Sequence, residues 1–299
     1  MSSQFSIIQE EFDDDLESIR ALLGVVTDPS KPQMRIAAAN SATLLLAATF
    51  EQFVREMART YARAIVGAAK DFKAVPKKLV QTAWRRTMAG LAEVEVSATP
   101  FAEGSRKDAL RKFNSVYQFC NGDKTQDIYE ELIHNENNMR PGQINLLFSI
   151  SDLQDICLKT SDKEPMLQYL QETDANKAHG LILGYINNFF ERRNEIAHAL
   201  GTRHSSGSDQ ILKDVDFFLA FSISVAQTLE KTLEVMRVTS VVDRVFVLGV
   251  DGNLFEVHSV GLRTKASDYL KQLREFHQAR GKTFQYKVEL KNGTEFSVS

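Results

Sequence analysis

Apolar residues recur at helical spacing almost throughout the first 238 residues of this 299-residue chain. An amphipathic helix places apolar side chains three and four positions apart, and each such helix must bury its apolar stripe against another one. Helices are expected over residues 4–24, 33–69, 76–90, 104–120, 125–134, 142–158, 163–172, 175–199 and 208–238. The last two, joined by a short polar loop, are expected to pack antiparallel. This part of the chain is therefore predicted to fold as an all-helical domain.

The pattern changes after about residue 239. β-Branched residues become frequent, and the pairs Asp251-Gly252 and Asn292-Gly293 are typical of tight hairpin turns. Strands are expected over residues 241–250, 254–260, 284–290 and 294–298, with one helix over residues 266–280. The predicted fold class is mainly α, with a helical domain over residues 1–238 and a small α+β domain of ββαββ order over residues 239–299. Such a small domain is expected to dock on the helical domain or on a partner.

The end of the helix predicted over residues 175–199 carries three polar residues whose chemistry suits a phosphodiester. Asn194 and His198 are four residues apart and share one helix face, and the long side chain of Arg193 can reach toward the same place. An imidazole exchanges protons near neutral pH, since its ordinary pKa is about 6.5. A guanidinium is a permanent planar cation that suits phosphate. These residue types indicate half of a metal-free site for phosphodiester cleavage.

The string RRNEIAHALG around these residues resembles the signature of the HEPN superfamily, in which four residues separate an Arg from a His near the end of a long helix. Arg193, Asn194 and His198 fill the three motif positions, and Ala199 stands where many members have Gly. The resemblance covers residues 1–238 in architecture and implies a HEPN-like helical bundle. It also implies a metal-independent endoribonuclease of a toxin or antiviral-defence system. The alternative is a catalytically inactive HEPN module that binds RNA, a nucleotide or a partner protein.

The predicted reaction uses the 2′-hydroxyl of RNA as nucleophile and leaves a 2′,3′-cyclic phosphate and a 5′-hydroxyl. We expect His198 to transfer protons, Arg193 to stabilise the charged phosphate, and Asn194 to orient His198 or the backbone. One chain supplies only one such His, so a homodimer is expected to bring two Arg and two His around one cleft, as the resemblance also implies. The competing interpretation is structural, with Arg193 in a surface ion pair and His198 capping the last carbonyls.

Two charged residues near this motif allow more than one interpretation. Arg192 is interpreted as a solvated partner of Glu191 or Glu195. Glu51 interrupts the apolar stretch LLLAATFEQF and is expected to be partly buried. It either supports the Arg–His pair from behind or forms an ion pair with Arg55, four residues further along the same helix.

Charge is unevenly distributed along the chain. Residues 31–112 contain 15 Lys or Arg and 7 Asp or Glu, whereas residues 1–30 and 113–176 are strongly acidic. Candidates for RNA binding in the basic segment are Lys77, Lys78, Trp84, Arg85 and Arg86. The cations are expected to contact the phosphate backbone and Trp84 to stack on a base. The alternative is that the basic segment neutralises the acidic segments within the fold.

Composition excludes several other classes of function. The net charge of −3 does not indicate a general electrostatic attraction to nucleic acid or to a membrane. The sequence contains no metal-ligand spacing, phosphate-binding loop or nucleophile elbow, so neither a metal nor a cofactor is expected. Cys120 and Cys157 are expected to be buried free thiols. The acidic start and the lack of a long apolar run predict a cytoplasmic protein without a membrane partner. RNA is the expected partner, and the resemblance implies an antitoxin or defence-system partner.

Overall fold

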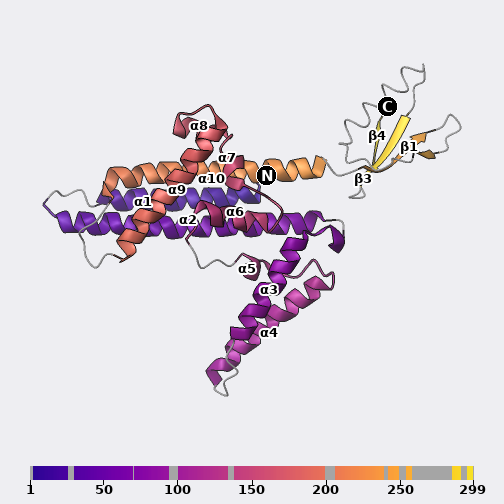
Figure 1. Cartoon of the computed structure of the whole chain (residues 1–299), viewed down its shortest axis with the longest axis horizontal. Coiled ribbons are helices and arrows are strands. Elements are labelled where there is room, and N and C mark those ends of the chain that lie inside the picture. Colours follow the sequence, from indigo (N-terminus) through magenta and orange to yellow (C-terminus); the bar gives the residue numbers. More distant parts are fainter. Residues whose placement is uncertain are drawn as a thin grey trace. The chain divides into compact units, whose positions relative to one another are not determined.

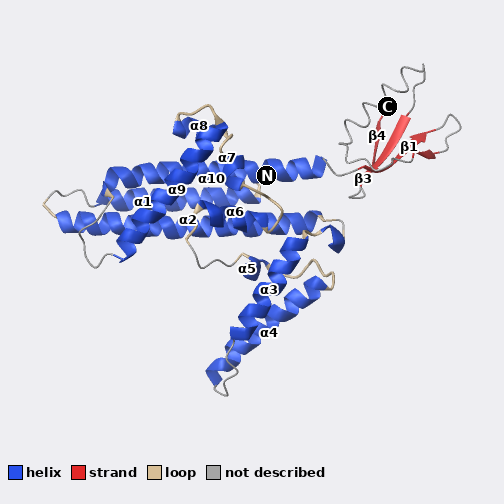
Figure 2. Cartoon of the chain, viewed as in Figure 1, coloured by secondary structure: helices blue, strands red, loops and turns tan. Residues whose placement is uncertain are grey.

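The computed structural model describes residues 3–25, 30–69, 71–93, 100–133, 138–198 and 206–238, followed by four strands. The chain divides into two compact units, one of residues 1–66 and 75–231 and the other of residues 67–74 and 232–299. Figure 2 shows that the described part of the chain is mainly helical. The mainly α fold class predicted from apolar spacing is thus confirmed for the helical part of the chain.

Ten α-helices occur among the described residues, and most match their predicted ranges to within four residues at each end. They are α1 (Gln4–Val25), α2 (Pro32–Ala68), α3 (Lys77–Glu93), α4 (Pro100–Cys120), α5 (Tyr129–Leu132), α6 (Pro141–Ser149), α7 (Ile156–Thr160), α8 (Glu164–Leu170), α9 (Ala175–His198) and α10 (Gly207–Val238) (Figure 1). A short 3₁₀ helix, η1, spans Phe72–Ala74. The long helices α2 and α10 bury the most apolar side chains, and α1 and α9 pack against them.

Two predicted helices are wrong in length. Residues 125–134 are helical only over the single turn of α5, and the helix predicted over 142–158 is broken between α6 and α7. The break has a backbone cause, because Asp152 and Asp155 adopt left-handed φ values of 64° and 51° that no α-helix continues through. The apolar pattern does not reveal the break, since the turn between the two helices also buries Ile150 and Leu153.

Phe50 of α2 lies at the centre of the core and contacts rings from three other helices. Its ring centroid lies 6.4 Å from Phe12 of α1, 6.3 Å from Phe190 of α9 and 4.2 Å from Phe218 of α10. All four side chains are buried, and burying a side chain of this size contributes about 1.5–3 kcal/mol. Phe50 thereby fixes α1, α9 and α10 against α2.

Helices α9 and α10 pack antiparallel, as predicted. Tyr185 of α9 stacks on Phe217 of α10 with centroids 4.0 Å apart, and one turn further along α9 Phe189 meets Phe218 at 4.8 Å. At the end of α9, Arg192 reaches back to Asp214, near the start of α10. The end of α9, which carries the motif residues, therefore lies beside the beginning of α10.

The four described strands form one antiparallel sheet in the order β2-β1-β3-β4. They are β1 (Val242–Leu248), β2 (Leu254–Val257), β3 (Gln285–Leu290) and β4 (Glu295–Val298) (Figure 2). The pairs β1–β2 and β3–β4 are consecutive in the chain and flank the two predicted hairpin turns. The helix predicted over residues 266–280 lies outside the described residues, so the ββαββ order stays a prediction.

Candidate functional site

The last turns of α9 place apolar side chains in the core and the motif residues at its edge. Ile182, Ile186, Phe189 and Phe190 lie on one helix face and are fully buried. Arg193 and Asn194 follow at the border of this face and are half-buried, whereas His198, the last residue of the helix, is exposed. The same periodicity that packs α9 into the bundle thus brings the motif residues to the surface.

Arg193 and Asn194 are joined in a short hydrogen-bonded chain that also includes Asn138. Nη1 of Arg193 donates to Oδ1 of Asn194 over 3.2 Å, and the same oxygen accepts from Nδ2 of Asn138 at 2.9 Å. Within the described residues, Nε of Arg193 is buried without a hydrogen-bond partner, and no carboxylate pairs with this guanidinium. A half-buried cation with unused donors is well suited to bind phosphate.

Arg192, the neighbouring residue, is paired with a buried acid inside the protein. Its Nη2 donates to both carboxylate oxygens of Asp214, at 2.7 and 2.8 Å, and Asp214 is completely buried. Gln210 donates to the same carboxylate at 3.1 Å. Burial raises the pKa of the Asp214 carboxyl, and the guanidinium of Arg192 opposes part of that rise. The interpretation of Arg192 as a solvated partner of Glu191 or Glu195 is therefore wrong, because a buried acid on α10 needs its charge.

His198 stands apart from the other two motif residues. In the part of the chain that the structure describes, its imidazole makes no hydrogen bond or ion pair with Arg193 or Asn194. The residues that follow, 199–205, lie outside the described ranges. The structure therefore brings Arg193 and Asn194 together and leaves His198 exposed at the end of α9.

Glu51 forms an ion pair with Arg55, which is one of the two interpretations that the sequence allows. Nη2 of Arg55 lies 3.2 Å from Oε2 of Glu51, and both side chains are largely covered, with 22% and 16% of their surface exposed. The other oxygen, Oε1, is buried without a hydrogen-bond partner among the described residues. Nothing in this geometry connects Glu51 to Arg193, so its support of the motif remains a hypothesis.

Two residues of this region were not identified from the sequence. Asn138 lies 56 positions before Asn194 in a segment without regular structure, and no local pattern links the two. The sequence does contain a pattern that indicates a buried Asp214, because this residue lies between Ile211, Val215 and Phe218 on the apolar face of α10. A charged residue at a core position requires a partner of opposite charge, which here is Arg192.

A comparison with models of protein families shows to which family this chain belongs. The family model described as RiboL-PSP-HEPN matches residues 10–231, from α1 into α10. The chain belongs to this family. The predicted HEPN relationship is confirmed, and with it the description as a HEPN nuclease-like or RNA-related module. No curated protein and no solved structure matches the chain.

In this HEPN protein, three of the five residues predicted to bind RNA line one pocket between α3 and α6. Lys78, Arg85 and Arg86 surround a volume of about 400 Å³ together with Thr82, Ala89, Leu146 and Ile150. Lys77 is exposed but does not line this pocket. Trp84 lies on the side of α3 that packs on α4, where its ring contacts Phe113 at 6.3 Å. The structure therefore groups the three cations and separates them from Trp84.

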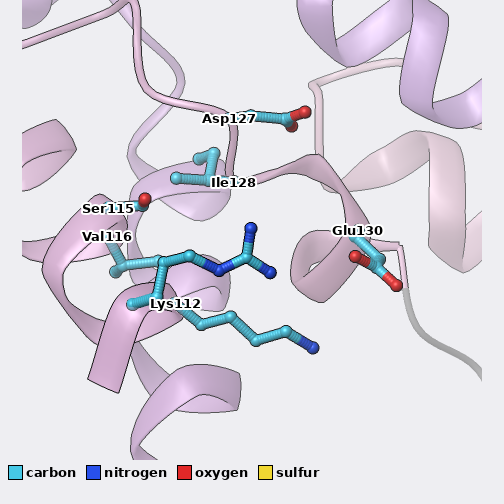
Figure 3. Close-up of a pocket in the computed structure, with 7 residues that line it drawn as sticks. Lys112, Ser115, Val116, Asp127, Ile128 and Glu130 are labelled. Atoms are coloured by element: carbon cyan, nitrogen blue, oxygen red, sulfur yellow. The ribbon is translucent and has the colours of Figure 1, made fainter. Parts of the chain in front are cut away.

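The far end of the basic segment lies against acidic residues. Lys112 of α4 lines a pocket of about 160 Å³ that Asp127 and Glu130 also line. Figure 3 shows Lys112 and Glu130 extending into this pocket from opposite sides. Asp127 also forms an ion pair with Arg63 of α2 at 3.5 Å. Charge neutralisation within the fold accounts for this part of the basic segment, whereas the lining of the α3–α6 pocket, as far as the structure describes it, contains no acidic residue.

The sequence also predicts whether the protein has a metal site, buried cysteine thiols or a membrane-spanning helix. Among the residues described, no three His, Cys, Asp or Glu side chains gather in a group suited to hold a metal ion. Cys157 is buried and Cys120 is half-buried, and burial raises the pKa of the Cys157 thiol to about 12. No helix in the described ranges combines the length and the apolar character needed to cross a membrane.

Proposed function

We propose that this HEPN protein is a metal-independent endoribonuclease of the toxin or antiviral-defence type and acts as a homodimer. The observation that carries the proposal is the state of Arg193, which has no carboxylate partner within the described residues although its neighbour Arg192 has one. A guanidinium held beside Asn194 with unused donors provides a site for a phosphate. Membership of the RiboL-PSP-HEPN family supports RNA as the substrate.

The proposed reaction requires three functions that this chain carries on one helix. His198 takes the proton from the 2′-hydroxyl or returns one to the leaving 5′ oxygen, which general acid–base catalysis accelerates by about 10²–10⁴-fold. Arg193 stabilises the negative charge that accumulates on the phosphate. Asn194 holds the Arg193 guanidinium through the 3.2 Å hydrogen bond and is itself held by Asn138.

A homodimer supplies the second proton-transfer group that one chain lacks. HEPN domains commonly bind RNA and form dimers. A two-fold axis near the end of α9 brings two Arg193 and two His198 side chains to one cleft. His198 is exposed at the last position of α9, which leaves it accessible to a second copy.

The test of catalysis is cleavage of bulk RNA in the presence of EDTA. The wild-type protein is expected to produce 5′-hydroxyl and 2′,3′-cyclic phosphate ends, and the His198→Ala variant is expected to lose at least about 100-fold in rate. Equal rates for the two proteins, or cleavage that EDTA abolishes, would overturn the proposal.

The test of a shared site is a mixture of two inactive variants. Heterodimers of His198→Ala and Arg193→Ala chains contain one intact histidine and one intact arginine on different chains. A composite site predicts that the mixture cleaves RNA faster than either variant alone. A mixture no faster than its components, with heterodimers present by native mass spectrometry, contradicts a composite site.

One observation favours a second candidate function, a catalytically inactive HEPN module that binds RNA, a nucleotide or a partner protein. No group within the described residues orients the His198 imidazole, and a general base needs such orientation. Binding of RNA to the wild-type protein without any cleavage would establish this function instead.

We assign roles in RNA binding and in regulation to the remaining parts of the chain. Lys78, Arg85 and Arg86 contact the RNA backbone, and the domain of residues 239–299 serves docking, oligomerisation or sensing. An antitoxin or defence-system partner restrains the activity in the cell. Deletion of residues 239–299 that leaves assembly, RNA affinity and regulation unchanged would contradict the role of this domain.

A further inference from the structure

The α3–α6 pocket brings positively charged side chains together on one side of α3. Three cations line it, and none of the other described residues around it is acidic. Lys78 is the second residue of α3, where the helix dipole already disfavours a positive charge. A basic first turn therefore adds an electrostatic cost at this end of the helix.

The two outer cations keep donors for a ligand. Nζ of Lys78 donates to Oγ of Ser149 at 2.7 Å, and Nε of Arg85 lies 3.5 Å from the carbonyl of Gln81. Both side chains are exposed, and within the described residues neither pairs with a carboxylate. Lys78 can donate two further hydrogen bonds, and Arg85 retains both of its terminal nitrogens.

Arg86 forms the inner wall of the pocket. Its Nη1 donates to the carbonyl of Leu132, which fixes α3 against the end of α5. Burial lowers the pKa of Arg86, and the charge of Arg85 beside it lowers the pKa further. An anion between these side chains relieves their mutual repulsion.

An apolar surface lies opposite the charged side. Leu146 of α6 is 44% exposed although it is a large aliphatic residue, and it lines the pocket with Ile150 and Ala89. The volume of about 400 Å³ lies within the range of small-molecule sites. A planar base fits on such a surface while its phosphate meets the cations, whereas a bare phosphate would leave the apolar side unused.

We propose that the α3–α6 pocket binds a single phosphorylated nucleotide, with the phosphate at Lys78 and Arg85 and the base on Leu146. The nucleotide is either free or one residue of an RNA chain. The pocket shares no residue with the Arg193–Asn194 site, so the proposal stands independently of catalysis.

Titration calorimetry on the full chain tests this proposal. The protein carries Arg193→Ala so that no substrate is consumed, and the probes are adenosine 5′-monophosphate, adenosine, inorganic phosphate and a short single-stranded oligodeoxyribonucleotide. A charge-assisted hydrogen bond to phosphate is worth enough that Lys78→Gln and Arg85→Gln are each expected to weaken binding of the monophosphate by about 10-fold or more. Lys77→Gln removes the adjacent exposed lysine that does not line the pocket, and it is expected to leave the affinity unchanged.

The outcomes separate the source of the nucleotide from the existence of the site. Tighter binding of the monophosphate than of the oligonucleotide identifies a free nucleotide, and the reverse order identifies a nucleic-acid chain. Adenosine and inorganic phosphate are both expected to bind more weakly than the monophosphate. Equal losses in Lys77→Gln and Lys78→Gln, or no binding of either the monophosphate or the oligonucleotide, overturns the proposal. Because every protein in this series is a cleavage-deficient variant, failure of the nuclease function does not affect the result.

Discussion

Arg192 and Arg193 are adjacent on α9, and the structure uses them in opposite ways. Arg192 neutralises a completely buried carboxylate on α10, whereas the only hydrogen bond of the Arg193 side chain among the described residues goes to the amide of Asn194. A charge that is paired in the interior holds the fold together, because removal of its partner leaves a desolvated ion behind. A charge without such a partner at the surface serves a ligand. The comparison therefore assigns stability to Arg192, and it supports the proposal that Arg193 carries the chemistry.

The largest effect is expected from Arg193→Ala. Loss of one group that stabilises transition-state charge slows RNA cleavage by about 10²–10³-fold. The free energy of unfolding is expected to change by no more than about 0.5 kcal/mol, since the side chain has no internal ion pair within the described residues. Cleavage assays and urea denaturation on the same preparation measure both quantities. A variant that cleaves normally, or one that unfolds, breaks the assignment of chemistry to Arg193.

Asp214→Ala tests whether the Arg192–Asp214 pair stabilises the fold. Removal of this buried carboxylate leaves Arg192 unpaired and is expected to lower the free energy of unfolding by about 3–5 kcal/mol. The matched control is Asp216→Ala, two residues away, because Asp216 is half exposed and pairs with Arg20 at 2.6 Å. That exposed pair is expected to contribute about 0–1 kcal/mol. Urea denaturation that gives equal losses for both variants would refute the stabilising role of the Arg192–Asp214 pair.

A smaller effect is expected from Asn138→Ala. This change removes the 2.9 Å hydrogen bond that fixes the Asn194 amide, so Arg193 loses part of its orientation. A neutral hydrogen bond contributes about 0.5–1.5 kcal/mol, which corresponds to a loss of about 2–10-fold in cleavage rate. Steady-state cleavage of a short RNA at saturating concentration measures it. An unchanged rate would show that Asn194 does not depend on Asn138 for its position.

Glu51→Gln is expected to have the smallest effect. The Arg55 pair explains the position of this carboxylate, so the cleavage rate should remain within about twofold and stability within about 1 kcal/mol. The same cleavage and denaturation assays apply. A rate loss above about tenfold at unchanged stability would instead support the hypothesis that Glu51 assists the Arg–His pair.

The sequence predicted the fold well where one physical signal dominates. The long helices α2, α9 and α10 follow from sustained apolar spacing, and their ends agree with the structure within two residues. Prediction failed between α6 and α7, because the break depends on the left-handed backbone at Asp152 and Asp155. Apolar spacing reports which side chains are buried, and it does not report the path of the backbone between them.

The candidate site was predictable only in the part that one helix contains. Arg193, Asn194 and His198 are close in sequence, so helical geometry places them together. Asn138 and Asp214 come from other segments, and their contacts with α9 follow from the packing of the whole bundle. The separation of Trp84 from the cations of α3 also depends on packing, here against Phe113 of α4.

The ring of Phe50 on α2 contacts rings of α1, α9 and α10, and none of the motif residues takes part in those contacts. A mutation at Arg193 or His198 leaves this aromatic centre intact. Under the proposed function, a lineage can therefore lose the reaction in a single step and keep the scaffold, and it can regain the reaction by restoring one side chain. If the protein acts as the proposed homodimer, active and silent gene copies that arise in this way share one assembly surface, and a silent copy restrains an active one by entering mixed dimers.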